Sequence, residues 1–236
     1  MRIAFAVGAV VCIIVCYYGV TIYRNVSVSH SLIARAKPYQ IDRRATIIST
    51  TSVLVLGDST AVGVGAGSPE ESVAGLLADK IHAAVVENYA VSGAVVADLP
   101  AQIKQAKLSQ YSLILIQIGG NDLTRFHDAK KTAAALDQAL AVLPKSHRVA
   151  VMPPGNIGSA PIFPWFLKAS YTRLNLVYHR EFSVVVKGRH FIYVNVYKER
   201  AADLFSLRPD LYFAADQFHP SSLGYGLWFS DLMDNI

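Results

Sequence analysis

Short, almost wholly apolar runs recur between residues 51 and 236 and alternate with longer segments that have helical spacing. Examples are Val53-Leu54-Val55-Leu56 and the run from Leu113 to Ile118, which is apolar apart from Gln117. Strands with so few polar residues are buried on both faces of a sheet. Their alternation with helices favours a parallel sheet covered by helices on both sides. The sequence therefore predicts an α/β domain with five parallel strands, near residues 52–56, 85–91, 113–118, 149–152 and 191–196.

Helices are predicted between these strands. Ser68-Pro69-Glu70-Glu71 is typical of a helix start, with serine at the N-cap and proline in the first turn. Val73, Leu77 and Ile81 supply the core-facing side of the helix that follows. Further helices are predicted near residues 98–108 and 132–143, in a long segment that ends near residue 186, and at 223–233.

The first 23 residues differ from the rest of the chain. No charged residue lies between Arg2 and Arg24, and about 20 apolar residues are enough to cross a bilayer as a helix. We interpret residues 1–23 as a transmembrane anchor, 24–50 as a basic stem or linker, and 51–236 as the folded domain. A cleaved signal peptide is the alternative, but the apolar stretch is longer than usual and has no clear small-x-small cleavage site.

The predicted location is therefore the membrane, with a single N-terminal span. Which side the domain occupies stays open, because the basic residues after the span favour the cytoplasm whereas a short basic start is typical of export. The formal net charge of +5 lies entirely in the first 50 residues. A basic stem favours contact with anionic lipid head groups, and a neutral domain gives no support for nucleic-acid binding.

Two separated segments of the domain carry residues for nucleophilic chemistry. Gly57-Asp58-Ser59 follows the first predicted strand, and Asp216-Gln217-Phe218-His219 precedes the last predicted helix. Open parallel sheets bind ligands where their strands end. A serine needs a general base, and a carboxylate near the histidine holds the imidazole in the tautomer that accepts the serine proton. We predict Ser59 as nucleophile, His219 as base and Asp216 as the group that orients it.

Two further segments end the second and third predicted strands. Val91-Ser92-Gly93-Ala94 offers the Gly93 N–H, and Gly119-Gly120-Asn121-Asp122 offers the Asn121 side-chain amide. With the Ser59 N–H, these donors suit an oxyanion hole, which stabilises the charge that develops during acyl transfer. Turn and supporting roles are expected for Asp58 and Asp122.

Together the four segments resemble the SGNH, or GDSL-type, hydrolase superfamily, whose blocks contain Ser, Gly, Asn and His; here these are Ser59, Gly93, Asn121 and His219. Thr60 stands where the GDSL motif has leucine. The resemblance covers residues 51–236. It implies a flavodoxin-like three-layer α/β/α sandwich, and ester hydrolysis with no cofactor and no metal. It allows lysophospholipids, short acyl esters, thioesters and acetylated glycans as substrates.

The sequence also bears on several alternative functions. The glycines from Gly63 to Gly67 do not have the spacing of a dinucleotide fingerprint, and the Gly-x-Ser-x-Gly pentapeptide of α/β-hydrolases is absent from the sequence. An acyltransferase that uses the same acyl-enzyme, or a catalytically inactive membrane-tethered binding domain, stays open, as does the oligomeric state. Arg125 is interpreted as a surface charge or as a contact for an anionic substrate group. Residues that either line an acyl pocket or pack onto their own domain are Pro154, Ile157, Phe163, Trp165 and Phe166.

Overall fold

A computed structural model gives the backbone of residues 2–46 and 48–236 and the side chains of residues 16–46 and 48–236. These residues form a six-stranded sheet with the order β1-β3-β2-β4-β5-β6. Its strands are β1 (Ile41–Asp42), β2 (Ser52–Gly57), β3 (Val85–Asn88), β4 (Gln110–Gln117), β5 (Lys145–Met152) and β6 (Ile192–Tyr193).

The strands from β2 to β6 are all parallel to their neighbours. Numbered among themselves in chain order, they follow the sequence 2-1-3-4-5, which is the order of flavodoxin-like sheets. The order reverses between β2 and β4, so the carboxyl ends of these two strands form the topological switch point where such sheets bind ligands. This sheet order therefore places the segments after β2 and β4 at one potential site.

The sixth strand, β1, was not predicted. It pairs antiparallel with β3 through Ile41 and Val86, and it lies in the segment interpreted as a stem. A strand of two residues is too short to show a period of two in the sequence. Its neighbour Tyr39 is buried against the core, so this part of residues 24–50 packs on the domain.

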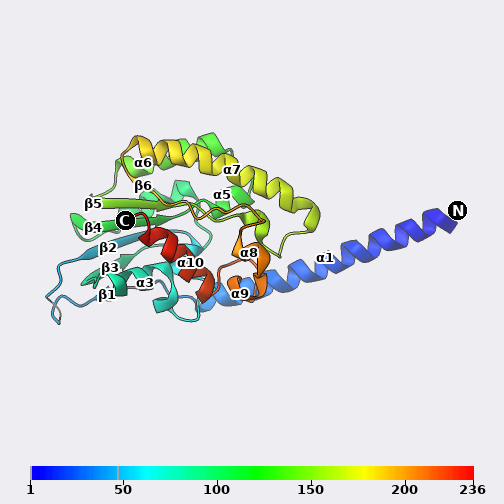
Figure 1. Cartoon of the computed structure of the whole chain (residues 1–236), viewed down its shortest axis with the longest axis horizontal. Helices are drawn as coiled ribbons and strands as arrows, with labels where there is room; N and C mark the ends of the chain where they lie inside the picture. The colour runs from blue at the N-terminus through cyan, green and yellow to red at the C-terminus, as the bar shows by residue number, and fades with distance from the viewer. Residues whose placement is uncertain (1, 47) are drawn as a thin grey trace.

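Helices cover both faces of the sheet (Figure 1). Val53 and Val55 of β2 face a core cluster that includes α3 (Val73–Lys80) and α10 (Ser222–Met233). Leu54 and Leu56 face a second cluster, because successive side chains of a strand point to opposite faces. That second cluster is built with α4 (Leu99–Ile103), α6 (Ala129–Ala141) and α7 (Trp165–Gly188).

The remaining elements are short. They are α2 (Ser59–Val62), α5 (Gly120–Thr124), α8 (Leu204–Leu207), α9 (Pro209–Tyr212) and the 3-10 turns η1 (Pro69–Glu71), η2 (Val96–Asp98) and η3 (Ile157–Ser159). The start predicted for the helix after the first strand differs from the observed start of α3. Ser68 begins the turn η1, and α3 is capped by Ser72, whose Oγ accepts from the Gly75 N–H at 3.2 Å.

The N-terminal helix α1 (Arg2–Arg35) corrects the prediction for the start of the chain. Among the residues whose side chains are described, the structure has no helix with the length and hydrophobicity that a bilayer crossing requires. This finding contradicts the transmembrane anchor predicted over residues 1–23, and with it the membrane localisation. Residues 1–15 of that predicted span lie outside the described side chains.

The physical reason is visible in the described part of α1. The helix does not end with the apolar run but continues through Arg24 and His30, and charged residues are costly inside a bilayer. Leu32 and Ile33, near its C-terminal end, pack against the core cluster on the α3 and α10 side of the sheet. This end of the helix is therefore anchored by the protein domain.

Gly57, the last residue of β2, is required by the close approach of β4. An added Cβ would lie 1.9 Å from the Gln117 carbonyl oxygen, and φ is +139°. We expect Gly57→Ala to lower the free energy of unfolding by about 3 kcal/mol, through overpacking and backbone strain. Urea unfolding measures this. Gly226→Ala in α10 is the control, because nothing lies within 4 Å of its added Cβ; equal stability of the two variants would contradict the expectation.

Candidate active site

Ser59 lies at the first turn of α2, directly after β2. Asp58 caps this helix: its Oδ1 accepts from the Thr60 N–H at 2.9 Å and from the Thr60 hydroxyl at 2.8 Å. The Asp58 N–H donates to the carbonyl of Gln117 at 3.0 Å, which ties the turn to the end of β4. Local capping thus holds the Ser59 side chain at the switch point of the sheet.

A tight turn from residue 213 to 220 presents Asp216 and His219 together. Asp216 Oδ1 accepts the backbone N–H groups of Phe218 at 3.1 Å and His219 at 3.0 Å, as Asp side chains do in turns. The Ala214 N–H donates to the His219 carbonyl at 2.8 Å and closes the turn. Hydrogen bonds within this turn therefore position both the carboxylate of Asp216 and the imidazole of His219.

The two segments meet in one chain of hydrogen bonds. His219 Nδ1 lies 2.6 Å from Asp216 Oδ2, and His219 Nε2 lies 2.9 Å from Ser59 Oγ. An ionised carboxylate only accepts, so Nδ1 carries the proton and Nε2 accepts from the serine hydroxyl. All three side chains are buried. This is the contact pattern of a nucleophile, a base and an orienting carboxylate.

Electrostatics favour the ionised form of Asp216. Burial alone raises its pKa, but the side-chain hydrogen bond and charge of His219 and the two backbone N–H groups outweigh burial, and the pKa lies below its usual value. Asp58 differs, because burial raises its pKa and the Thr60 hydrogen bonds only partly oppose this. Asp58 also accepts from the Gly120 backbone, so it links the serine turn to the loop after β4.

The two predicted oxyanion segments lie against each other. The Asn121 side-chain amide donates to the Ala94 carbonyl at 3.0 Å, and the Arg125 guanidinium donates to the Gly93 carbonyl at 3.1 Å. Asp122 Oδ2 accepts from the Val96 N–H at 3.0 Å, which is the supporting role expected for it. These contacts brace the Gly93 loop from α5.

A cavity opens beside Ser59 and His219. It is narrow and partly open to solvent, with a volume of about 70 Å³. Asn121 lines it as well, whereas Gly93 is not among its lining residues. Most of the wall is apolar or aromatic; its apolar members are Ile118, Pro154, Gly155, Ile157, Ala160, Val196, Phe205, Phe213, Phe218 and Trp228, with Asn156 and Asp203 among the polar ones.

The residues suggested for an acyl pocket divide into two groups. Pro154 and Ile157 line the cavity. Phe163 packs on Tyr171, with ring centroids 4.3 Å apart, and Trp165 and Phe166 are exposed on α7. The sequence pattern did not identify Phe205, Phe213 and Trp228 as cavity residues, because they come from distant short elements that meet only in the folded chain.

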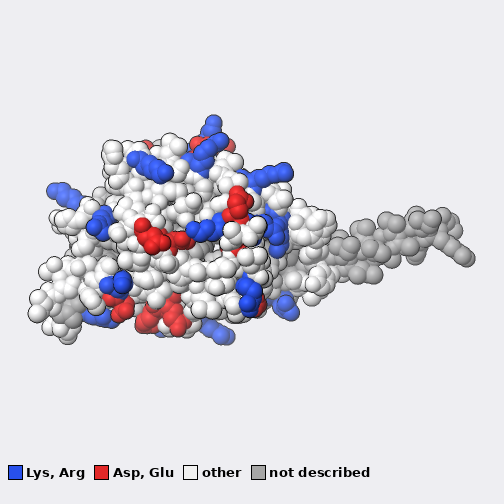
Figure 2. Space-filling view, in the orientation of Figure 1, with Lys and Arg blue, Asp and Glu red and all other residues white. Residues whose placement is uncertain are grey.

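Charged side chains of both signs are interspersed on the face of the domain shown in Figure 2. This agrees with the neutral charge balance of residues 51–236. Among the described residues, no group of three or more His, Cys, Asp or Glu side chains is placed to hold a metal ion. The polar side chains that line the cavity include the hydroxyl of Ser59, the imidazole of His219, the amides of Asn121 and Asn156, and the carboxyl groups of Asp58 and Asp203.

Comparisons with known proteins identify the family. The sequence matches the profile of the GDSL-like lipase/acylhydrolase family over residues 55–227. No curated protein matches the sequence. Similar crystal structures include phospholipase A1 from Streptomyces albidoflavus NA297, with 18% identity, a TM-score of 0.60 and coverage of 80% of this chain and 100% of that chain.

Two further crystal structures have a similar fold. An extracellular lipase from Streptomyces rimosus has 19% identity and a TM-score of 0.61, covering 79% of this chain and 100% of its own. A member of the lipolytic G-D-S-L family from Veillonella parvula DSM 2008 has 17% identity and a TM-score of 0.61, covering 78% and 97%. The family profile spans most of the domain that carries the serine, histidine and aspartate, and this chain belongs to the GDSL-like lipase/acylhydrolase family.

Proposed function

We propose that this protein is a serine esterase that hydrolyses carboxylic esters through an acyl-enzyme. The observation that carries the proposal is the continuous contact from Asp216 through His219 to Ser59 at the mouth of an apolar cavity. Membership of a lipase and acylhydrolase family supports the same reaction class.

In the proposed reaction, His219 Nε2 takes the proton of Ser59 as Oγ attacks the ester carbonyl. The new C–O bond converts the carbonyl oxygen into an oxyanion. The N–H groups of Ser59 and Gly93 and the Asn121 amide are the proposed donors to it. His219 then gives its proton to the leaving alcohol, and water attacks the acyl-enzyme by the reverse path to release the acid.

The cavity favours the acyl group as its occupant. Its wall is aromatic and aliphatic beyond Ser59, and apolar surface removed from water contributes roughly 25 cal/mol per Å² to binding. The alcohol side of the ester then faces the open side of the cavity. The proposed substrate class is thus an ester of an apolar acyl chain, with lipid esters included.

The direct test is active-site labelling of the whole chain. We expect a fluorophosphonate to form one covalent adduct, at Ser59, which mass spectrometry of the peptides locates. We also expect p-nitrophenyl esters to release equal amounts of p-nitrophenol and free acid, because water is the proposed acceptor. An adduct at another serine would overturn the assignment of Ser59, and acyl transfer to an added alcohol in place of acid release would show a transferase.

A further inference from the structure

One wall of the cavity is a short segment that follows β5 and includes the first residues of η3. We call residues 154–158 the pocket wall; Pro154, Gly155, Asn156 and Ile157 of this segment line the cavity. Gly155 lies close to Trp228, another residue of the cavity lining, because an added Cβ would be 3.2 Å from the indole. A small movement of the pocket wall would therefore change the width of the cavity.

The pocket wall is held by side chains from α7. We call Thr172, Asn175 and His179 the α7 polar stripe, because their spacing of three and four residues places them on one face of the helix. Asn175 is fully buried and His179 is 7% exposed. Buried polar groups in such positions need hydrogen-bond partners. The pocket wall provides one for the Asn175 side-chain oxygen and one for His179 Nε2, whereas the buried Asn175 Nδ2 has no hydrogen-bond partner among the described residues.

Each member of the α7 polar stripe bonds a different residue of the pocket wall. His179 Nε2 donates to the Pro154 carbonyl at 2.8 Å. The Thr172 hydroxyl donates to Asn156 Oδ1 at 3.0 Å. The backbone N–H of Ile157 donates to Asn175 Oδ1 at 2.8 Å. Three residues of the pocket wall, Pro154, Asn156 and Ile157, are thus hydrogen-bonded to α7.

Backbone packing reinforces these bonds at Gly158. A Cβ added there would lie 2.2 Å from Thr172 Oγ1 and 2.4 Å from the Lys168 carbonyl oxygen. The absence of a side chain therefore lets the pocket wall rest directly on the surface of α7. The helix sets the distance between this wall and the rest of the cavity.

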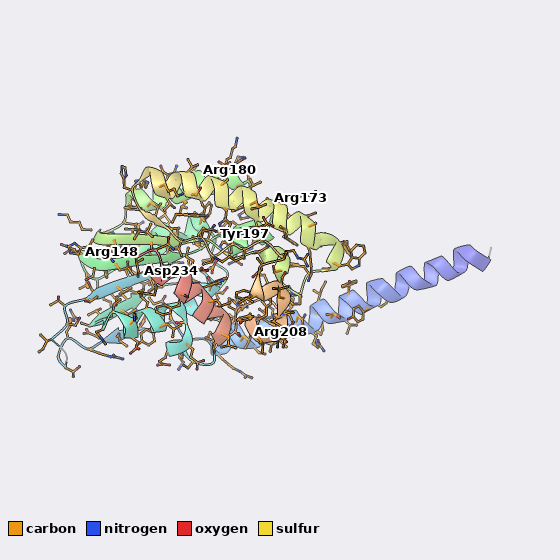
Figure 3. All side chains as sticks on the ribbon, viewed as in Figure 1. Arg148, Arg173, Arg180, Tyr197, Arg208 and Asp234 are labelled. Carbon is orange, nitrogen blue, oxygen red and sulfur yellow. The ribbon has the colours of Figure 1, made fainter. Side chains whose placement is uncertain are left out.

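His179 is also held at its other ring nitrogen, Nδ1, and through its ring. Its Nδ1 accepts from the Tyr193 hydroxyl, and its ring lies 5.4 Å from that of Tyr197. Burial lowers the pKa of His179, which favours the neutral ring that donates at one nitrogen and accepts at the other. Figure 3 labels Arg173 and Arg180 along α7 and Tyr197 beneath it.

We propose that the α7 polar stripe determines which acyl chains the cavity accepts, by fixing the position of the pocket wall. This rests on the proposed function. Thr172, Asn175 and His179 are positioning residues, since none of them is among the lining residues of the cavity. Ser59 and His219 are held by different elements, so loosening the pocket wall is expected to change acyl selection and leave the chemistry at Ser59 intact.

The test compares His179→Leu with His179→Gln in the full chain, on p-nitrophenyl acetate and octanoate. Leucine removes the donor to Pro154, whereas the glutamine amide nitrogen reaches the position of Nε2. We expect His179→Leu to lower kcat/KM for octanoate roughly tenfold, which corresponds to about 1.4 kcal/mol, mainly by raising KM. The loss for acetate should stay below about twofold, because the shorter acyl chain has less surface to contact the pocket wall, and glutamine should restore octanoate hydrolysis.

Thr172→Val is the second variant, because it keeps the shape of the side chain and removes one bond to the pocket wall. We expect the same selective loss on octanoate, about threefold, consistent with the smaller end of single hydrogen-bond effects. Ser183→Ala is the matched control, since its hydroxyl donates to the Arg180 carbonyl within α7. Equal losses on both esters, or failure of glutamine to rescue, would overturn the inference alone. Absence of fluorophosphonate labelling in the wild type would instead overturn the proposed function.

Discussion

Replacing Ser59 with alanine is expected to lower kcat/KM for carboxylic esters by about 10⁶-fold, the scale of losing the nucleophile in a serine protease. The reason is that no other hydroxyl among the described residues contacts His219. The fold should persist, because alanine favours the first turn of α2 and the Asp58 cap does not involve the Ser59 side chain. Ester hydrolysis and fluorophosphonate labelling measure the effect.

Ser146→Ala is a suitable control for this variant. Ser146 lies at the start of β5, where its hydroxyl donates to the Arg148 carbonyl at 2.7 Å, and it should be labelled no differently from the wild type. Equal free energies of unfolding in urea for Ser59→Ala and the wild type would show that the loss of activity comes from the missing nucleophile. If Ser59→Ala kept its esterase activity, the acyl-enzyme mechanism would have to be abandoned.

Replacing Asp216 with asparagine is expected to lower kcat by about 10⁴-fold, as for the orienting aspartate of a serine protease. Asparagine still accepts the backbone N–H groups of Phe218 and His219, but its amide donates where the carboxylate accepted. The imidazole then carries its proton on Nε2 and cannot accept from Ser59. Activity near that of the wild type would show that Asp216 does not set the tautomer.

Asp216→Asn also tests a predicted pH dependence of the free energy of unfolding. The pKa of Asp216 is lower in the folded state than its ordinary value of 3.8, so the carboxylate contributes stability that is fully present above pH 3.8 and is lost as pH falls through the folded pKa. The stability difference between wild type and Asp216→Asn should therefore shrink below about pH 4. Urea unfolding across this range measures it.

Asp210→Asn provides the matched carboxylate control. Its hydrogen bonds from Arg208 lower the pKa of Asp210 as well, but this pair is exposed on α9, where salt bridges contribute little to stability. We expect unchanged kcat and only a small change in stability. A loss of activity in Asp210→Asn as large as that in Asp216→Asn would point to a general charge effect.

The start of the chain is where the structure departs most from the prediction. The apolar run before Arg24 suggested a membrane anchor, since hydropathy is read from a window of residues alone. The helix instead continues to Arg35 and packs on the domain through Leu32 and Ile33. Hydropathy contains no information about which surface a helix will cover, so this prediction failed.

The parallel strands and the four polar segments could be predicted from the sequence, because strand burial and turn chemistry are local properties of neighbouring residues. It could not assign Thr172, Asn175 and His179, which look like ordinary helix residues until α7 is laid against the pocket wall. The folded chain shows that Ser59 Oγ and His219 Nε2, which are distant in the sequence, lie 2.9 Å apart, and that aromatic residues from α8 and α10 line the cavity. Those facts depend on which elements pack together, and long-range packing is not encoded in any single window of the sequence.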